Sequence, residues 1–340
     1  MDSSEGQTAL RSPMTQTLPL VSPLLVATDG SPSALLAQRL VYPLASVVKM
    51  RDREPVLHCL TVEPRPSRRR AAEAEPPDPE EASGEAAPTA SQNAVLEAIA
   101  ADLPADLSVS LQVRQGRPAN EILRYARRTR PGLIALGQHG VGGVRELLLG
   151  SVSSAIARYA DCPILIARHP ETEAPTEARW QRILLVVNGF PATKQAIALT
   201  RQILPIGVQH VSIFCVQPPL TSQYLFGPFA TPTPNSQLTL SLQQVQHEQS
   251  EQLIHQAEAA LADSGIDVSS QIQIGEPGPL ICQLAQHHQS DLIIVGSDRR
   301  PAFRNIRLNA TGDYLIHHAP CPVLLCRNPQ NDTAHPAESP

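Results

Sequence analysis

The sequence has few aromatic residues, no closely spaced cysteine pair and no long apolar run, and each absence excludes a class of protein. Aromatic residues make up 3% of the 340 residues, so the cores must be built from Leu, Ile, Val and Ala. The cysteines are scattered singly, which favours buried reduced thiols over disulfides or a zinc site. The apolar stretch from Leu18 contains Pro23 and runs into Asp29, whereas a membrane span takes about 20 apolar residues.

Positive charge is not in excess either. The formal net charge is −5, which argues against broad binding to nucleic acid or acidic membranes. Residues 1–17 are polar and resemble no signal peptide, so we expect a cytoplasmic protein with neither a membrane nor a nucleic acid as partner. At about 150 residues per domain, the length predicts two domains.

One stretch combines a buried strand, a glycine-rich loop and the start of a helix. The apolar run 133–136 is followed by glycines at 137, 140, 142 and 143, and a helical pattern opens at Gly150-Ser151. Glycines let backbone N–H groups approach an anion, and a first helical turn adds unpaired donors and the positive end of the helix dipole. The pattern therefore predicts a phosphate site, to which the Ser151 and Ser153 hydroxyls could donate. It matches neither the Walker nor the dinucleotide glycine spacing.

The spacing Gly137-x2-Gly140-x9-Gly150-Ser151 resembles the ATP-binding signature of the universal stress protein family. Residues 25–31 resemble the first strand of that family, which ends in its adenine-side aspartate, and residues 161–166 resemble its last strand. The other interpretation is a glycine loop that only turns a strand into a helix. The resemblance implies two tandem α/β, Rossmann-like domains (adenine nucleotide alpha hydrolase-like), each a five-stranded parallel sheet of order 3-2-1-4-5. The ligand would lie beyond the carboxyl ends of the strands.

The resemblance also implies a ligand, ATP or another adenine nucleotide, with or without Mg. Asp29 would contact the adenine side, the glycines would let the backbone approach the ribose and phosphates, and the helix start would hold the phosphate tail. His139 is either a phosphate or ribose contact or a solvent-facing loop residue. The implied binding residues are Ala27, Thr28, Asp29, Val62, Gly137, His139, Gly140, Gly150, Ser151, Val152 and Ser153.

The second half of the chain repeats the first. Asp29-Gly30-Ser-Pro32 recurs as Asn188-Gly189-Phe-Pro191, an offset of 188 − 29 = 159 residues, and Gly116-Arg-Pro118 recurs at the same offset. We therefore expect a flexible tail over 1–20, domain 1 over 21–170, a linker over 171–180, domain 2 over 181–329 and a tail over 330–340. Low apolar content predicts a disordered insertion over 63–92, and domain 2 carries its own insertion over 217–240.

The second repeat looks degenerate at the predicted site. It has Asn188 for Asp29, Arg299 for Gly140, Asn309 for Gly150 and Ala310 for Ser151. We therefore expect one intact site per chain. Three readings of the arginines at 299, 300, 304 and 307 stay open: a lock in which Arg299 reaches Asp313, a separate anion site, or a solvated basic loop.

No catalytic arrangement is evident, so we expect a stress-response regulator rather than an enzyme. The histidines of the second half do not converge as metal ligands should. The alternatives are a nucleotide-independent dimerisation or scaffold module, and a slow ATPase, which would need a metal and a base that the sequence does not identify. The last strands of the domains, 163–168 and 322–327, are apolar edges that we expect to pair as an intramolecular pseudo-dimer. A homo-oligomer is left open.

Overall fold

The computed structural model describes residues 20–51, 57–63, 97, 99–140, 149–168, 180–219, 236–302 and 305–328. Within these, only the backbone is described for 49–51, 236–239, 299–302 and 305–308. Most of the predicted tails, the insertion after residue 63 and the linker lie outside the described residues. None of the described helices is long and apolar enough to cross a membrane.

Domain 1 is a parallel sheet in the order β3-β2-β1-β4-β5. Its elements are β1 (Leu24–Ala27), α1 (Pro32–Arg51), β2 (Leu57–Glu63), β3 (Val109–Gln115), α3 (Pro118–Thr129), β4 (Leu133–Gly137), α4 (Ser151–Tyr159) and β5 (Ile164–Ala167). Ser31 precedes α1 and its Oγ accepts a hydrogen bond from the Ala34 N–H at 3.4 Å, so the side chain caps the helix.

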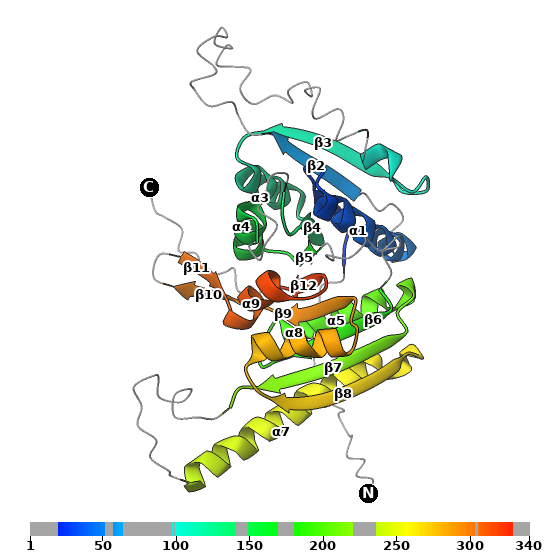
Figure 1. The fold of residues 1–340 in the computed structure, drawn as a ribbon. Coiled ribbons are helices and arrows are strands. Elements are labelled where there is room, and N and C mark those ends of the chain that lie inside the picture. The colour runs from blue at the N-terminus through cyan, green and yellow to red at the C-terminus, as the bar shows by residue number, and fades with distance from the viewer. Residues whose placement is uncertain are drawn as a thin grey trace, which may run out of the picture.

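Domain 2 repeats this order as β8-β7-β6-β9-β12, which confirms the predicted fold (Figure 1). Its strands are β6 (Arg182–Val187), β7 (His210–Gln217), β8 (Asp267–Ile274), β9 (Leu292–Gly296) and β12 (Val323–Cys326), with the hairpin β10 (Arg299–Ala302) and β11 (Asn305–Leu308). Its helices are α5 (Thr193–Ile203), η3 (Leu204–Ile206), α7 (Ser236–Leu261), η4 (Ala262–Ser264), α8 (Pro277–His287) and α9 (Ala310–His318).

Regular structure extends into both predicted insertions. Glu63 is the last residue of β2 and pairs with Gln115, Gln217 ends β7, and α7 begins at Ser236 rather than after residue 240. The region after Pro234 lacks proline and is rich in Gln and Leu, which are good helix formers, so the helix begins earlier than the polar composition suggests.

The two domains form one ten-stranded sheet, because β5 and β12 pair in antiparallel fashion. The register joins Val323 to Ile166, Leu324 to Leu165 and Leu325 to Ile164, all of them buried. Leu165 and Leu324 lie in the core on one face of the sheet, and the side chains at 164, 166, 323 and 325 lie in the core on the other. The predicted pseudo-symmetric pairing is therefore confirmed, and each core runs through both domains.

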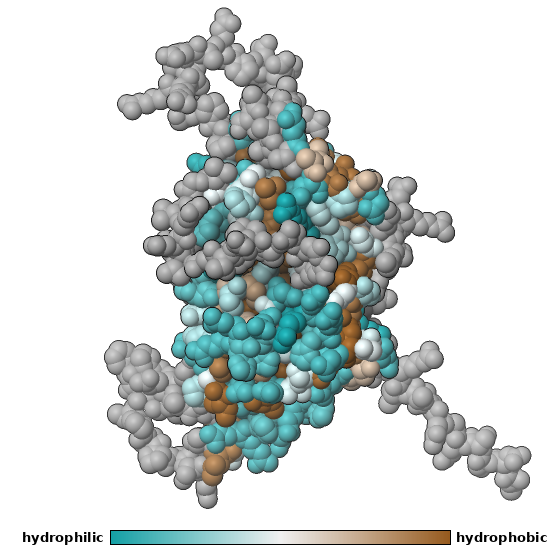
Figure 2. All heavy atoms as spheres, turned by 45° about the vertical axis from the view of Figure 1, so that its right-hand side comes forward, coloured by the Kyte–Doolittle hydropathy of each residue, from teal (hydrophilic) through white to brown (hydrophobic). Residues whose placement is uncertain are grey.

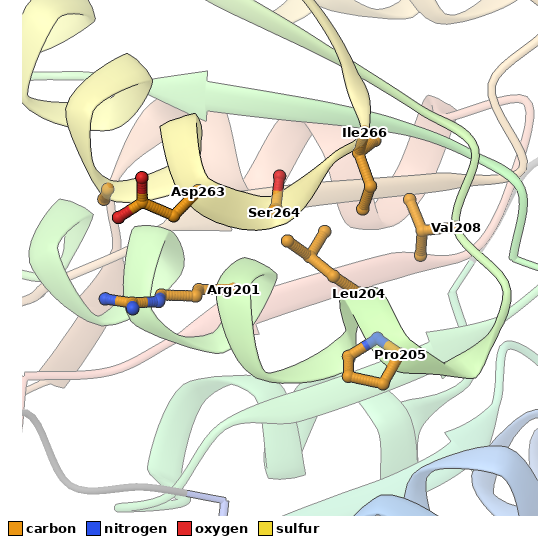
Figure 3. Close-up of a pocket in the computed structure, with 8 residues that line it drawn as sticks. Arg201, Leu204, Pro205, Val208, Asp263, Ser264 and Ile266 are labelled. Atoms are coloured by element: carbon orange, nitrogen blue, oxygen red, sulfur yellow. The ribbon is translucent and has the colours of Figure 1, made fainter.

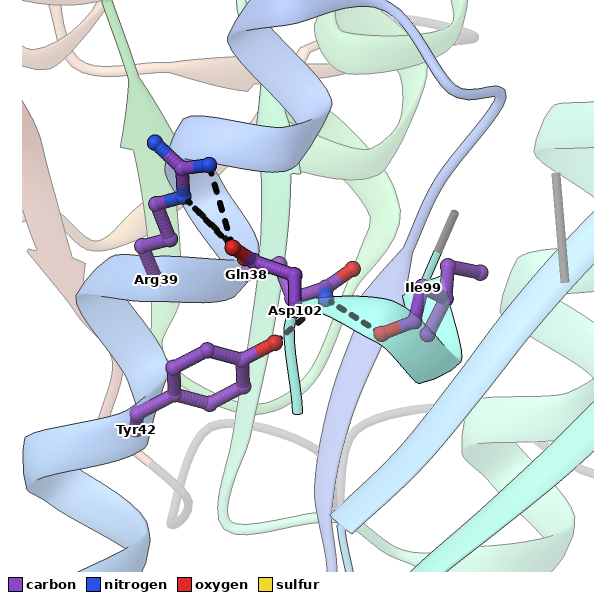
Figure 4. A network of polar contacts seen from close by, with 5 residues as sticks. All are labelled: Gln38, Arg39, Tyr42, Ile99 and Asp102. Atoms are coloured by element: carbon purple, nitrogen blue, oxygen red, sulfur yellow. Dashed lines mark hydrogen bonds and ion pairs between the residues drawn. The ribbon is translucent and has the colours of Figure 1, made fainter. Parts of the chain in front are cut away.

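A polar network holds the chain in place where it returns from the first insertion (Figure 4). Residues 97 and 99–101 of this segment are helical, and a turn follows at 102. The Gln38 side-chain amide donates to the Tyr42 hydroxyl and, at 3.4 Å, to the Ile99 carbonyl, while Arg39 pairs with Asp102 at 3.0 Å. Burial raises the pKa of Tyr42, which keeps its phenol protonated. These contacts fasten the described part of this segment to α1.

Candidate functional site

The predicted site residues gather at the carboxyl ends of β1 and β4, the central strands of domain 1. Ala27 ends β1 opposite Leu136, and Gly137 ends β4 one residue further. The chain turns away from β1 into α1 and from β4 towards α4, so the two loops begin at the same edge of the sheet. Such an edge is the usual ligand position in an open parallel sheet.

The loop after β1 presents the Asp29 carboxylate at this edge. Thr28 is buried, and its Oγ1 accepts from the Gly30 N–H at 3.2 Å. Asp29 is exposed, and its Oδ1 accepts from the Ser31 N–H at 3.0 Å, which fixes the direction of the carboxylate. Gly30 has φ 80°, a conformation that favours glycine. Val62 is half-buried in β2, two residues beyond Leu60, whose carbonyl accepts from the Thr28 N–H.

The loop after β4 is bound tightly to the start of α1. A Cβ atom on Gly137 would lie 2.4 Å from Ser33 Oγ and 2.6 Å from the Ala34 nitrogen, so only glycine permits this close packing. The hydroxyls of Ser33 and Ser31 both donate to the His139 carbonyl, at 2.6 and 3.1 Å. Residues 137–139 are therefore held against α1.

Gly140 lies directly over Asp29. A Cβ atom at position 140 would be 2.4 Å from Asp29 Oδ2, although the two residues are 111 positions apart in the sequence. The φ of Gly140 is outside the left-handed region, so the need for glycine here arises from contact and not from backbone conformation. A side chain at this position would have to displace the carboxylate.

The helix α4 begins without a side-chain cap. Its N-cap residue is Gly150, whose N–H donates to the Gln138 carbonyl at 2.9 Å and so ties the helix start to the loop after β4. The N–H groups of residues 151–153 precede the first intrahelical bond, from the Ser154 N–H to the Gly150 carbonyl. Ser151 is exposed and Val152 half-buried, so the first turn is accessible.

Ser153 differs from the sequence prediction. Its side chain is buried and donates to the Gly137 carbonyl at 2.7 Å. A hydroxyl has a single hydrogen, so this side chain holds the strand end to the helix and is not available as a donor to a phosphate. Of the two predicted hydroxyl donors, Ser151 keeps that capacity.

Arg168 is a neighbour of the site that sequence reasoning missed. His139 is partly buried, and burial, with the positive charge of Arg168 as a second cause, lowers the pKa of its imidazole. The Arg168 Nη1 is buried and has no hydrogen-bond partner among the described residues. The sequence does contain a sign that this position matters, because an arginine occurs at 168 and again at 327, at the repeat offset of 159.

Domain 2 turns the equivalent polar groups inward. The Asn188 Oδ1 accepts from the Phe190 N–H at 3.2 Å and from Thr193 Oγ1 at 2.6 Å. Its Nδ2 donates to the Gly296 carbonyl at 3.2 Å. Domain 1 has the exposed Asp29 carboxylate at this position. Domain 2 has the Asn188 amide, whose oxygen accepts from the loop after β6 and whose nitrogen donates to the end of β9.

The equivalent helix of domain 2 is capped by its own side chain. Asn309 Oδ1 accepts from the Gly312 N–H at 2.8 Å and from Ser297 Oγ at 3.1 Å. A Cβ on Gly312, the counterpart of Ser153, would lie 2.7 Å from that oxygen, so glycine here makes room for the cap. The first turn of α9 thus bonds to the side chain of its N-cap residue, whereas the N-cap residue of α4, Gly150, has no side chain that could do so.

A hairpin takes the place of the glycine loop in domain 2. Strands β10 and β11 pair Arg299 with Leu308 and Arg300 with Arg307, and β11 lies beside α4 of domain 1. The sequence did not predict this element. The side chains of the hairpin arginines lie outside the described part of the chain, so the contact expected between Arg299 and Asp313 stays a prediction.

One cavity among the described residues is remote from the predicted site (Figure 3). It measures about 260 Å³ and lies between α5 and η4, with Arg201 and Asp263 in its wall. Val208 and Ile266, which also line it, precede β7 and β8, so the cavity lies at the amino ends of the strands. It therefore belongs to the opposite edge of the sheet from the predicted site.

All six cysteines are free thiols, as their spacing predicts. Burial raises the pKa of Cys162 to about 12 and that of Cys282 to about 11, which leaves both protonated near neutral pH. Among the described residues no group of three or more His, Cys, Asp or Glu side chains is arranged to hold a metal ion.

Comparison with known proteins identifies one family. The family model described as "Universal stress protein family" matches residues 21–168 and 179–327. A universal stress protein of Methanocaldococcus jannaschii is 34% identical over 67 residues, which are 20% of this chain and 39% of that protein. A universal stress protein structure from Archaeoglobus fulgidus has a TM-score of 0.53 at 18% identity, covering 90% of this chain and 98% of its own. An Arabidopsis thaliana family structure solved with AMP bound covers 46% of this chain and 97% of its own, at 16% identity and a TM-score of 0.32.

Proposed function

The chain belongs to the universal stress protein family, with two family domains in tandem, and we propose that domain 1 binds one adenine nucleotide while domain 2 binds none. The contrast between the two helix starts carries this proposal. The N-cap residue of α4 is Gly150, which has no side chain to cap the helix, whereas at the start of α9 the Asn309 side chain accepts from the Gly312 N–H. Uncapped N–H groups and the helix dipole attract a phosphate.

The residues of domain 1 fit such a ligand. The absence of a side chain at Gly140 lets this loop lie close to Asp29, and the exposed carboxylate can accept a hydrogen bond. The N–H groups of residues 151–153 and the Ser151 hydroxyl would hold the phosphates. Arg168 would add a positive charge near His139. The choice of adenine, and of ATP with or without Mg, follows from the family resemblance.

We propose a regulatory role in the stress response, in the cytoplasm, rather than catalysis. The Asp29 Oδ1 accepts from the Ser31 N–H, which orients the carboxylate as a ligand contact, and the sequence contains no recognisable catalytic motif. Nucleotide occupancy would then act by bracing the loop after β4 against α4. A scaffold role remains the second candidate, supported by the β5–β12 junction, whose strand pairing involves no residue of the predicted site.

Proline substitution at the first helical position tests the proposal. Ser151 is that residue in α4, and proline there removes both its N–H and its hydroxyl, the two donors proposed for the phosphates. The helix is not disturbed, because Gly150 already has the extended conformation that precedes proline. We expect Ser151→Pro to weaken ATP binding by about tenfold in a calorimetric titration of the full chain, as removal of a charge-assisted hydrogen bond does.

The matched control is Ala310→Pro, at the first position of α9, where Asn309 is also extended. It should leave ATP affinity unchanged, and both variants should unfold close to the parent. Equal weakening by the two substitutions, or no effect of Ser151→Pro, would contradict the assignment to α4. Absence of ATP binding by the parent protein would favour the scaffold role.

A further inference from the structure

The helix α3 and its flanks form a concentrated positive surface on a chain that is negative overall. Residues 114–130 contain six arginines and one glutamate, a formal +5, which leaves −10 on the remainder of a chain whose net charge is −5. The six are Arg114, Arg117, Arg124, Arg127, Arg128 and Arg130, of which all but the half-buried Arg114 are exposed. We call this set the α3 arginine surface. Its one acid, Glu121, is 7% exposed and pairs with Arg124 at 3.0 Å.

Two of these guanidinium groups are held in position by an aromatic ring. The Cζ atoms of Arg114 and Arg128 lie 5.3 and 5.4 Å from the centre of the Tyr125 ring. Tyr125 is buried, and its hydroxyl hydrogen-bonds to His58 Nδ1 at 2.9 Å. Because stacking restricts the arginine side chains before any partner arrives, less rotamer entropy is lost on binding.

Domain 2 shows that the fold does not require these arginines. At the repeat offset the six positions are occupied by Gln273, Glu276, Gln283, Gln286, His287 and Gln289. The backbone is nevertheless the same: Arg130 has φ 47° and Gln289 has φ 50°, each just beyond its helix. Hydrophilic residues cover most of the domain 2 part of the face seen in Figure 2, with apolar residues in smaller groups. The shared fold therefore does not explain the arginines of α3, which are a property of domain 1 alone.

We propose that the α3 arginine surface docks a short acidic polypeptide segment of a partner protein. Guanidinium groups bind carboxylates through paired hydrogen bonds. The 12 residues of α3 extend over about 18 Å, so the charges match a run of about six extended acidic residues better than one phosphate group.

Two features favour a peptide over a nucleic acid. The one ring on this surface, Tyr125, is buried and stacked by arginines, so it offers no platform for bases. The −10 on the rest of the chain would also repel a long polyanion wherever it extended beyond α3.

The test is fluorescence anisotropy of the full chain with a labelled peptide of eight glutamates. The triple variant Arg124→Gln, Arg127→Gln and Arg128→Gln should lower affinity about tenfold, since each exposed charge pair contributes modestly. Added salt should weaken binding to the parent protein. The control triple Arg182→Gln, Lys194→Gln and Arg201→Gln makes the same change in net charge on domain 2 and should leave affinity unchanged. ATP binding and the unfolding midpoint should be retained in both triples.

Three results would overturn the proposal. Equal loss in both triples would indicate a non-specific attraction. Tighter binding of a single-stranded oligonucleotide than of the peptide would make this a nucleic-acid surface. Peptide binding seen only after removal of residues 64–92, which contain six acidic residues, would mean that the chain's own segment competes for the surface in place of a separate partner.

Discussion

Substituting Gly140 by arginine, the residue that domain 2 has at the equivalent position, is expected to reduce adenine-nucleotide affinity at least about a hundredfold. The new Cβ would lie 2.4 Å from Asp29 Oδ2, so the carboxylate must move, and the added guanidinium would pair with it. The ligand would lose both the Asp29 contact and the close backbone approach. Two lost hydrogen bonds at about 1.5 kcal/mol each amount to about 3 kcal/mol, or roughly a hundredfold in affinity.

Calorimetric titration with ATP measures this effect, and the chain offers a matched control. Gly189 lies in the loop after β6 of domain 2, and a Cβ there would meet no atom within 4 Å. Gly189→Arg should therefore leave binding unchanged. Gly140 is exposed, so both variants should keep their unfolding midpoints. Undiminished ATP affinity in Gly140→Arg would show that the nucleotide does not approach the backbone at this loop.

The second large effect concerns the junction between the domains. Leu165 is 0% exposed and pairs with Leu324 across the β5–β12 contact, so Leu165→Ala leaves a cavity where the two domains share one core. We expect the free energy of unfolding to fall by about 3 kcal/mol, within the usual range for such core truncations. Because the core is shared, domain 2 should lose stability together with domain 1.

The single tryptophan reports on this coupling. Trp180 is buried just before β6, in domain 2, while the substitution is in domain 1. Urea unfolding followed by its fluorescence and by far-UV circular dichroism should give coincident transitions, shifted together by Leu165→Ala. The control Leu240→Ala, at a side chain 62% exposed, should change stability by less than about 0.5 kcal/mol. A tryptophan transition that stayed in place while circular dichroism shifted would mean that the domains unfold independently.

Local patterns predicted the individual strands and helices, and the family resemblance supplied their order in the sheet. The buried strands are short apolar runs, such as 133–136, bounded by glycine or proline, and the helices begin at recognisable caps such as Ser31. The internal repeat indicated two domains. The last strand of each domain is apolar, and because an uncovered apolar edge is unfavourable, we expected these two strands to pair. The hairpin over 299–308 was missed because each strand has only four residues and β10 contains Pro301 beside two arginines.

At the candidate site the sequence indicated which residues gather but not how they bond. Glycine spacing could not reveal that Gly140 lies over Asp29, since that contact depends on the packing of β1 beside β4. Domain 2 has Asn309 at the position equivalent to Gly150, and the sequence alone suggests only that a glycine has been lost. In the structure this change is the gain of a helix cap, which depends on the glycine at 312 as well. The hydroxyl of Ser153 was likewise predicted as a donor to phosphate, but it bonds to Gly137.

Native mass spectrometry of the full chain with ATP in excess tests the central claim most directly, because it counts bound ligands without assuming where they lie. Because α4 has no side-chain cap at Gly150 and α9 is capped by Asn309, the account predicts a single added mass of one nucleotide per chain. That added mass should disappear in Gly140→Arg and persist in Gly189→Arg. Two bound nucleotides per chain, or one that survives Gly140→Arg, would contradict it.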